Sequence, residues 1–237
     1  MDSAFDQTEA GAGAGGQEHL PDELPADPMP LCKQWFDEAN TRKAQPNANA
    51  MSLATVDHRG RPSARMVLCK EMDVARGCLV FFTNYTGRKA LAIEAHPYAA
   101  ALFHWDTLDR QIRIEGPVTK TSDAESDAYF ATRRWESQIG AWASEQSRPI
   151  ASRQALRDRV AEVIMRFGIP KDGPKGSGGT GIPRPPHWGG YRIWAERVEL
   201  WAAGEARIHD RAEWSRTLTP SGGGFVGGSW RATRLQP

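Results

Sequence analysis

Apolar and polar residues alternate with a period of two over much of the chain, which is the pattern of half-buried β-strands. Two segments of this kind flank the turn-forming stretch HRGRP, and two more flank TLD, so each pair predicts a β-hairpin. Strands are expected over residues 50–57, 63–73, 77–84, 98–106 and 110–120, and over most of residues 187–218 and 229–237.

Other segments show the helical spacing of apolar residues instead. Leu31, Trp35 and Ala39 recur at intervals of four, and Ser122 and Glu125 have the spacing of a capping box at the start of a longer periodic segment. We expect helices over residues 30–44, within 86–97, from about 123 through the segment 122–147, and over 152–168.

Six or more antiparallel strands with a few inserted helices indicate a mainly β, α+β fold. A closed or split β-barrel is favoured over a doubly wound parallel sheet. Residues 169–186 contain too much Gly and Pro for regular structure. Residues 1–26 are rich in Gly, Ala and acidic side chains, so we expect a flexible tail followed by one domain over residues 27–237.

The composition narrows the classes of partner. A formal net charge of +1 gives no long-range basic field for non-specific nucleic-acid binding, so any anion site must be local. Three cysteines without a CxxC pair argue against a disulfide framework and a zinc site. No apolar run approaches the roughly 18 residues that a membrane span needs. We expect a cytoplasmic protein without a nucleic-acid partner, a membrane partner or a bound metal.

Two neighbouring segments carry cations, and the second also carries hydroxyl groups. In RMVLCK, Arg65 and Lys70 are an odd number of residues apart, so in an unbroken strand they face opposite sides and can serve two anions. In TNYTGRKA, polar side chains surround Gly87 just before a helix, where free N–H groups and the helix dipole favour phosphate. These side chains are Thr83, Thr86, Arg88 and Lys89. A solvated basic turn explains them equally well.

A third candidate lies on the segment 122–147. Tyr129, Arg133 and Ser137 are spaced by four residues, so on one helix they share a stripe and can hold a phosphate monoester. An exposed helix face is the more common explanation of such a stripe.

The fourth candidate is RIHDR, residues 207–211. In an extended strand Arg207, His209 and Arg211 point to one face and Asp210 to the other, which forms a cationic row suited to an anion. No nucleophile elbow, HExxH or GxGxxG pattern occurs, so we expect a bound cofactor rather than a protein nucleophile to supply the catalytic power.

In their order along the chain, these stretches resemble the pyridoxine/pyridoxamine 5′-phosphate oxidases, which are flavoproteins. The resemblance extends from about residue 27 to the C-terminal RLQP. It is carried by RMVLCK, FFTNYTGRKA, RQIRIEG, YFATRRWESQIGAWASEQS, HWGGYRI, and ELW followed by RIHDR.

The resemblance implies a homodimeric split barrel with FMN at the subunit interface. The matching FMN-contacting positions are Arg65, Met66, Val67, Leu68, Lys70, Phe82, Thr83, Arg88, Lys89, Gln111, Gln146, Ser147, Trp201 and Arg211. The matching positions for the substrate's 5′-phosphate are Lys70, Tyr129, Arg133 and Ser137. Arg207 and His209 match the pair set against the substrate's pyridine ring, and they are the expected catalytic residues.

The implied reaction transfers two electrons from C4′ of pyridoxine or pyridoxamine 5′-phosphate to the flavin. O₂ then reoxidises the flavin and hydrogen peroxide is released; the amine also loses ammonia. Phe82 departs from the tyrosine of many relatives, and the acidic N-terminus lacks the basic segment that closes over some active sites. Two alternatives stay open: a flavin oxidase of the same fold acting on another ring, such as a phenazine precursor, and a non-catalytic module that binds flavin or pyridoxal phosphate.

Overall fold

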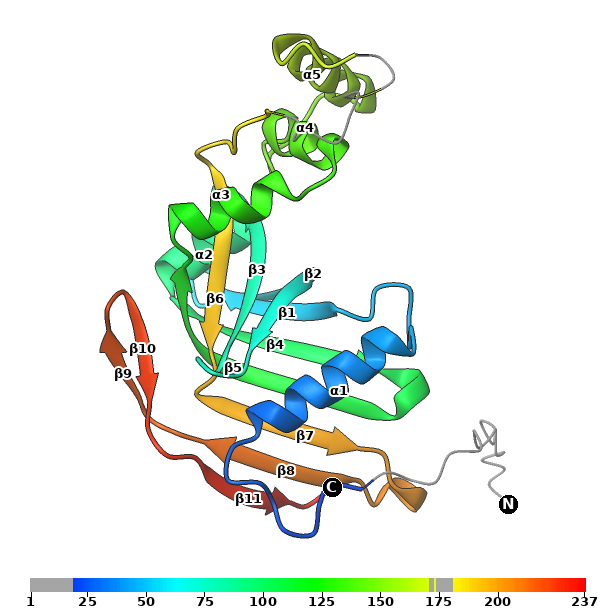
Figure 1. Ribbon diagram of the computed structural model, residues 1–237, viewed down its shortest axis with the longest axis vertical. Helices are drawn as coiled ribbons and strands as arrows, with labels where there is room; N and C mark the ends of the chain where they lie inside the picture. Colours follow the sequence, from blue (N-terminus) through cyan, green and yellow to red (C-terminus); the bar gives the residue numbers. More distant parts are fainter. Residues whose placement is uncertain (1–18, 171–172, 174–180) are drawn as a thin grey trace, which may run out of the picture.

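A six-stranded antiparallel barrel forms the centre of the molecule (Figure 1). The computed structural model describes residues 19–170, 173 and 181–237. Within them the barrel strands, in order of pairing, are β1 (Ala50–Val56), β2 (Pro62–Asp73), β3 (Cys78–Asn84), β6 (Trp188–Trp194), β5 (Arg110–Lys120) and β4 (Tyr98–Trp105). β4 pairs with β1 and closes the barrel, so the predicted antiparallel barrel is confirmed.

The barrel opens into a larger sheet at β5, which exchanges one neighbour for another along its length. Its first half pairs with β7 (Arg197–Ala202), and its end pairs with β6. Gly116 lies at the exchange, where a Cβ atom would stand 1.7 Å from the carbonyl oxygen of Trp194. Only glycine allows two backbones to approach this closely.

Beyond β7 the sheet continues through β8 (Asp210–Ser215) to β11 (Arg231–Leu235). Between these two strands the chain forms a separate hairpin of β9 (Leu218–Ser221) and β10 (Gly224–Gly227), which projects at one side in Figure 1. The hairpin is anchored to the barrel through Phe225, whose ring meets that of Trp194 edge-on at 5.9 Å.

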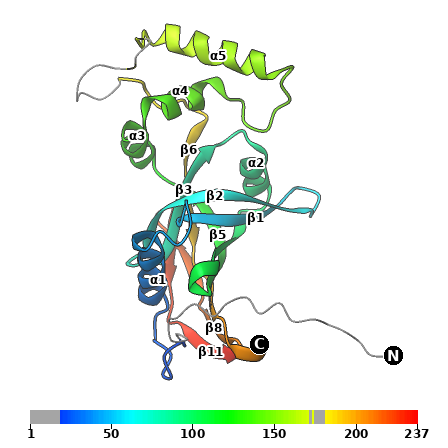
Figure 2. The same ribbon diagram turned by 90° about the vertical axis from the view of Figure 1, so that its right-hand side faces the viewer.

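Alternating side chains of the strands fill the barrel, as the period-two pattern predicts. In β5, Ile112 and Ile114 are fully buried. Helix α1 (Met29–Thr41) lies alongside the sheet (Figures 1 and 2). The buried Arg110 pairs with Glu38 of this helix at 2.6 Å, so the cost of burying its charge is offset.

The remaining helices are α2 (Arg88–Ala95), α3 (Asp123–Ala131), α4 (Trp135–Ala143) and α5 (Arg153–Arg166). α3 lies beside β6, and α4 and α5 are stacked at one end of the molecule (Figure 2). Their apolar side chains form a second core outside the barrel, with Phe130, Ile139 and Trp188 at its centre. None of the helices in the described residues is long and apolar enough to span a membrane.

The segment 122–147 is two helices where the pattern predicts one. The predicted capping box of Ser122 and Glu125 is present and starts α3. The Thr132 hydroxyl donates to the carbonyl of Tyr129 at 2.8 Å, and the backbone N–H of Arg133 donates to the carbonyl of Phe130 at 3.1 Å. These i→i+3 contacts end α3, and α4 begins only at Trp135.

The described part of the predicted N-terminal tail, residues 19–26, packs against the sheet. Leu20 is 3% exposed, and its backbone N–H donates to Asp210 of β8 at 2.8 Å. The indole N–H of Trp214 donates to the carbonyl of Pro25 at 2.7 Å. The expectation of a flexible tail is therefore wrong for this part, and residues 1–18 lie outside the described residues.

Candidate active site

A cavity of about 690 Å³ opens among the described residues, and we call it the main cavity. It is lined from β2, β3, α2, α3, α4 and the start of β6. The lining side chains are Arg65, Met66, Val67, Leu68, Lys70, Phe82, Thr83, Asn84, Lys89, Tyr129, Arg133, Arg134, Ser137, Gly140, Ala141, Ser144, Gln146 and Trp188. Five are lysine or arginine, and none of the described lining residues is Asp or Glu, which favours an anionic ligand.

One wall of the main cavity is an unpaired edge of β2. β1 pairs with β2 as far as Leu68, whereas β3 pairs with it only from Cys69 onward, across an irregularity between Cys69 and Glu71. Residues 65–68 therefore line the cavity consecutively, although their side chains alternate between faces. Lys70 lines the same cavity, beside the irregularity, so Arg65 and Lys70 reach one cavity although an unbroken strand would turn them to opposite sides. That they serve two anions stays a prediction.

Lys89 brings a largely buried charge to the main cavity. It is 9% exposed and donates to the Thr83 hydroxyl at 3.0 Å and to the Gln146 side-chain oxygen at 2.5 Å. Burial, assisted by the nearby charge of Arg65, lowers the pKa of Lys89 to about 8. Burial and the charge of Arg88 also lower the pKa of Arg65. Burying neighbouring positive charges is unfavourable without a negative partner, so such a cluster is expected where an anion binds.

Tyr129, Arg133 and Ser137 meet at the main cavity from three different elements. Tyr129 lies on α3, Arg133 in the connection and Ser137 on α4. The prediction that they share one helical stripe is wrong, but the break between the helices still brings the three side chains to one cavity. Burial lowers the pKa of Arg133, and its Nη1 is buried without a hydrogen-bond partner.

A second cavity of about 290 Å³, here called the strand cavity, lies on β4, β5, β7 and β8. Gln111, Trp201 and Arg211 are direct partners across three adjacent strands, so their side chains form one row. Arg211 donates to Glu199 from Nε at 3.0 Å and from Nη2 at 2.8 Å. The predicted FMN positions are therefore divided between two cavities that share no lining residue.

Family models account for most of the chain. Residues 37–167 match the pyridoxamine 5′-phosphate oxidase model, and residues 188–237 match the C-terminal dimerisation region of pyridoxine 5′-phosphate oxidase. The chain belongs to the pyridoxamine 5′-phosphate oxidase family.

Relatives within this family align over nearly their whole length. The chain is 50% identical to a pyridoxine/pyridoxamine 5′-phosphate oxidase of Cupriavidus necator over 211 residues, which cover 89% of each chain. It is 49% identical to one of Rubrobacter xylanophilus over 214 residues, 90% of this chain and 88% of that one. Among solved structures, PhzG from Burkholderia lata in complex with tetrahydrophenazine-1-carboxylic acid is 30% identical with a TM-score of 0.76, covering 91% of this chain and 95% of that chain.

Arg207 and His209, the family's expected catalytic pair, are not on a strand in this chain. Arg207 is the last residue of a 3₁₀ turn, η2 (Glu205–Arg207), His209 follows the turn, and β8 begins only at Asp210. Ala206 and Arg207 both have positive φ, at 51° and 64°, so the chain cannot be extended there. The prediction of a cationic strand face is therefore wrong.

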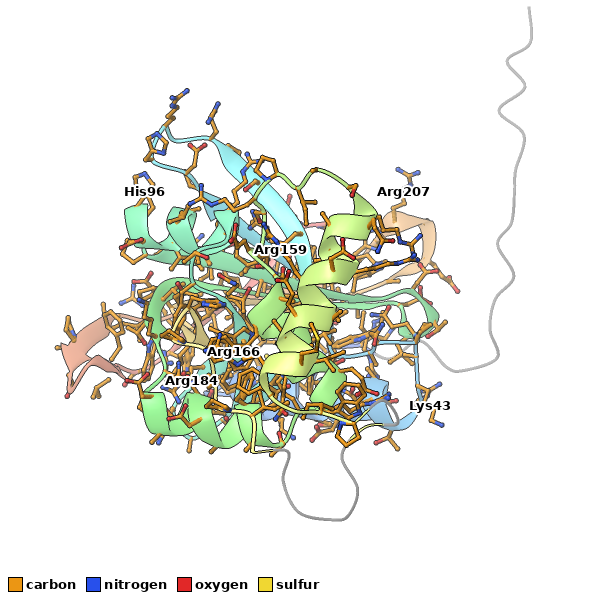
Figure 3. All side chains as sticks on the ribbon, turned by 90° about the horizontal axis from the view of Figure 1, so that it is seen from above. Lys43, His96, Arg159, Arg166, Arg184 and Arg207 are labelled. Carbon is orange, nitrogen blue, oxygen red and sulfur yellow. The ribbon has the colours of Figure 1, made fainter. Side chains whose placement is uncertain are left out.

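The turn nevertheless places His209 beside Trp201, which lines the strand cavity, although His209 itself does not line it. Its ring lies 4.7 Å from that of Trp201, and its Nδ1 accepts the backbone N–H of Gly204 at 3.2 Å. Because Nδ1 accepts, the neutral ring carries its proton on Nε2. Arg207 is exposed and extends from the margin of the molecule (Figure 3).

Two predicted FMN positions of the family do not line either cavity. Arg88 is exposed but close enough to Arg65 to affect its pKa. Ser147 is exposed in a turn with a φ of 70°. The remaining predicted positions line one of the two cavities, apart from Arg207 and His209.

Sequence reasoning missed several residues that line the main cavity. All of them stood within quoted motifs without being singled out: Asn84, Arg134, Gly140, Ala141, Ser144 and Trp188. Trp188 opens β6, and its placement beside Arg133 depends on tertiary contacts that the local pattern does not contain.

Proposed function

We propose that this protein oxidises pyridoxine 5′-phosphate and pyridoxamine 5′-phosphate to pyridoxal 5′-phosphate, with FMN as its cofactor. With O₂ the alcohol yields the aldehyde and hydrogen peroxide; the amine additionally consumes one water and releases ammonia. The observation that carries the proposal is the main cavity, where five cations and no described carboxylate surround hydroxyl groups, in a chain about half identical to such oxidases.

The residues present fit FMN. Lys89 and Arg65 are desolvated cations without a carboxylate among the described lining residues, so a phosphate there would relieve their mutual repulsion. The unpaired β2 edge at residues 65–68 offers backbone groups to a planar ring. When bound, FMN supplies a two-electron acceptor, and the chain supplies orientation and charge.

On the substrate side, Arg133, Tyr129 and Ser137 supply N–H and O–H donors for the 5′-phosphate, and Lys70 supplies a further charge. Fixing the phosphate fixes the distance of the ring from the cofactor, so its C4′ is presented in one orientation. His209 would donate from Nε2, because the backbone N–H of Gly204 already occupies Nδ1.

The division of the predicted positions between two cavities supports a homodimer. In a symmetric pair, the main cavity of one subunit can face the strand cavity of its partner, which gives two equivalent composite sites. The match of residues 188–237 to a dimerisation region agrees with this arrangement. The cytoplasmic location expected from the sequence stays a prediction.

A second candidate is suggested by the similarity to PhzG, whose structure holds a phenazine precursor. Such a substrate has a carboxylate but no phosphate ester. Arg133 with its unpaired Nη1 and the hydroxyls of Tyr129 and Ser137 favour the phosphorylated vitamer, because they would be left without partners by a ligand lacking that group.

The test uses purified protein loaded with FMN. We expect flavin absorbance, release of FMN on denaturation, and steady peroxide formation on adding either phosphorylated vitamer. Pyridoxine without phosphate should react far more slowly, and a dihydrophenazine carboxylate should not compete. Bound flavin without peroxide would indicate a binding module, whereas oxidation of only the phenazine precursor would favour the second candidate.

A further inference from the structure

Arg133 is charged and half-buried, yet no carboxylate pairs with it among the described residues. Its guanidinium carbon lies 4.6 Å from the centre of the Trp188 ring and 5.6 Å from that of Phe130. An aromatic face attracts a cation most strongly when the ring is that of tryptophan and when water is excluded. The ring here is that of a tryptophan that is 6% exposed, and the Nη1 atom of Arg133 is itself buried.

The choice of an aromatic partner has a consequence for ligand binding. A carboxylate partner would accept hydrogen bonds from the edge of the guanidinium and neutralise its charge. A ring beneath the guanidinium occupies the face and leaves the edge donors in the plane. The unpaired Nη1 of Arg133 is such a donor, and Arg133 lines the main cavity.

Trp188 is itself held firmly. Its ring is nearly parallel to those of Phe82 and Tyr129, with centres 5.5 Å and 6.2 Å away and interplanar angles of 11° and 6°. Its backbone carbonyl accepts a hydrogen bond from Arg184 at 2.6 Å. The ring therefore gives Arg133 a fixed platform.

We propose that Trp188 is a positioning residue for the substrate phosphate: its ring orients Arg133 and keeps the guanidinium edge free for that phosphate. This inference rests on the proposed function, in which Arg133 binds the phosphate. It assigns to Trp188 a role in discriminating phosphorylated from unphosphorylated ligands, although Trp188 need not contact the phosphate.

The test compares dissociation constants of the FMN-loaded protein for pyridoxal 5′-phosphate and pyridoxal, measured by equilibrium dialysis. Trp188→Leu removes the aromatic face and should weaken binding of the phosphorylated ligand about tenfold; Trp188→Phe keeps a weaker face and should cost about threefold. Binding of pyridoxal should stay within about twofold in both variants, because it does not use Arg133.

The chain offers a matched control in Trp142, which carries Arg166 at 4.7 Å in the same way but does not line the main cavity. Trp142→Phe should leave both constants unchanged. Arg133→Ala provides the second control: if Trp188 acts through Arg133, adding Trp188→Leu to Arg133→Ala should have no further effect on the phosphorylated ligand.

Equal weakening of both ligands by Trp188→Leu and Trp188→Phe would overturn the inference, because it would show general damage to the cavity. The inference would also be overturned if the effects of Trp188→Leu and Arg133→Ala on the free energy of binding pyridoxal 5′-phosphate simply added in the double variant. If the unaltered protein binds both ligands equally, then the phosphate site of the proposed function fails. Should Trp188→Leu not fold, Trp188→Phe and the double variant built on it decide the same question.

Discussion

Replacing Lys89 with methionine should stabilise the flavin-free protein. The Lys89 side chain is buried beside Arg65, and its pKa is lowered from 10.5 to about 8. This corresponds to about 3 kcal/mol against the charged form at neutral pH. Methionine removes that cost and also removes two hydrogen bonds, to Thr83 and Gln146, each worth about 1 kcal/mol. Because Thr83 still donates to Gln146 at 3.1 Å, the net gain should be about 1–2 kcal/mol.

The gain should depend on pH in a defined direction. Between about pH 8 and pH 10.5 the unfolded chain binds a proton at Lys89 that the folded chain does not, so the stability of the unaltered protein rises with pH there. The cost of the charged lysine is fully present below about pH 8. The advantage of Lys89→Met should therefore be greatest at pH 7 and decline above pH 8.

Urea unfolding of both flavin-free proteins at equal concentration, at pH 7 and pH 9.5, measures the difference. Lys43→Met, at an exposed lysine just after α1, is the control and should change stability by less than about 0.5 kcal/mol. FMN affinity should fall about 10- to 100-fold in Lys89→Met, the scale of one lost charge-assisted contact. A loss of stability at pH 7, or a gain that does not decline with pH, would refute the reasoning.

Two further predictions concern assembly and the N-terminal segment. If each site combines two subunits, mixing the impaired variants Arg133→Ala and Arg211→Ala should restore about a quarter of full activity. After subunit exchange half of the dimers are mixed, and one of the two sites in each mixed dimer is intact. If no activity returns, each site lies within one chain. Deleting residues 1–26 should lower the free energy of unfolding by about 2–4 kcal/mol, because Leu20 leaves its buried position and Asp210 and Trp214 lose backbone partners. Deletion of residues 1–18 alone, which spares those contacts, is the matched control, and an equal loss in the two deletions would contradict the assignment to Leu20 and Pro25.

The strands and the closed barrel could be predicted because their side chains obey a local rule, alternation between core and surface. The break in the segment 122–147 could not, because ATRRW contains neither Gly nor Pro. There the side chain of Thr132 ends the helix, and Gln138 donates to the Phe130 carbonyl at 2.8 Å. The alternative to a continuous helix thus depends on contacts made after folding.

The turn at residues 205–209 could not be predicted from the sequence either, because it depends on contacts made after folding. Alternating charges in RIHDR satisfy the strand pattern, yet Ala206 and Arg207 adopt positive φ, which their residue types do not favour. The close approach that selects this conformation involves Gly204, where a Cβ would stand 1.8 Å from the Ile208 carbonyl oxygen. At the N-terminus, the average composition of residues 1–26 gave no sign that Leu20 is buried, because its burial depends on the distant strand β8.

The two cavities differ in how their charges are compensated, and this difference indicates which part of a ligand each one takes. In the strand cavity Arg113 and Arg211 both pair with Glu199, which is 7% exposed, so their charges are largely satisfied within the chain. In the main cavity Lys89 and Arg133 have no carboxylate among the described lining residues. Phosphate groups should therefore bind at the main cavity, while the strand cavity, with Gln111 and the flat ring of Trp201, is suited to uncharged ring edges and faces. If one subunit carried the phosphate-binding and ring-binding residues side by side, Glu199 would lie near the phosphates, and its negative charge would oppose their binding. A site shared between two subunits keeps Glu199 and the phosphate-binding residues on separate surfaces of each chain.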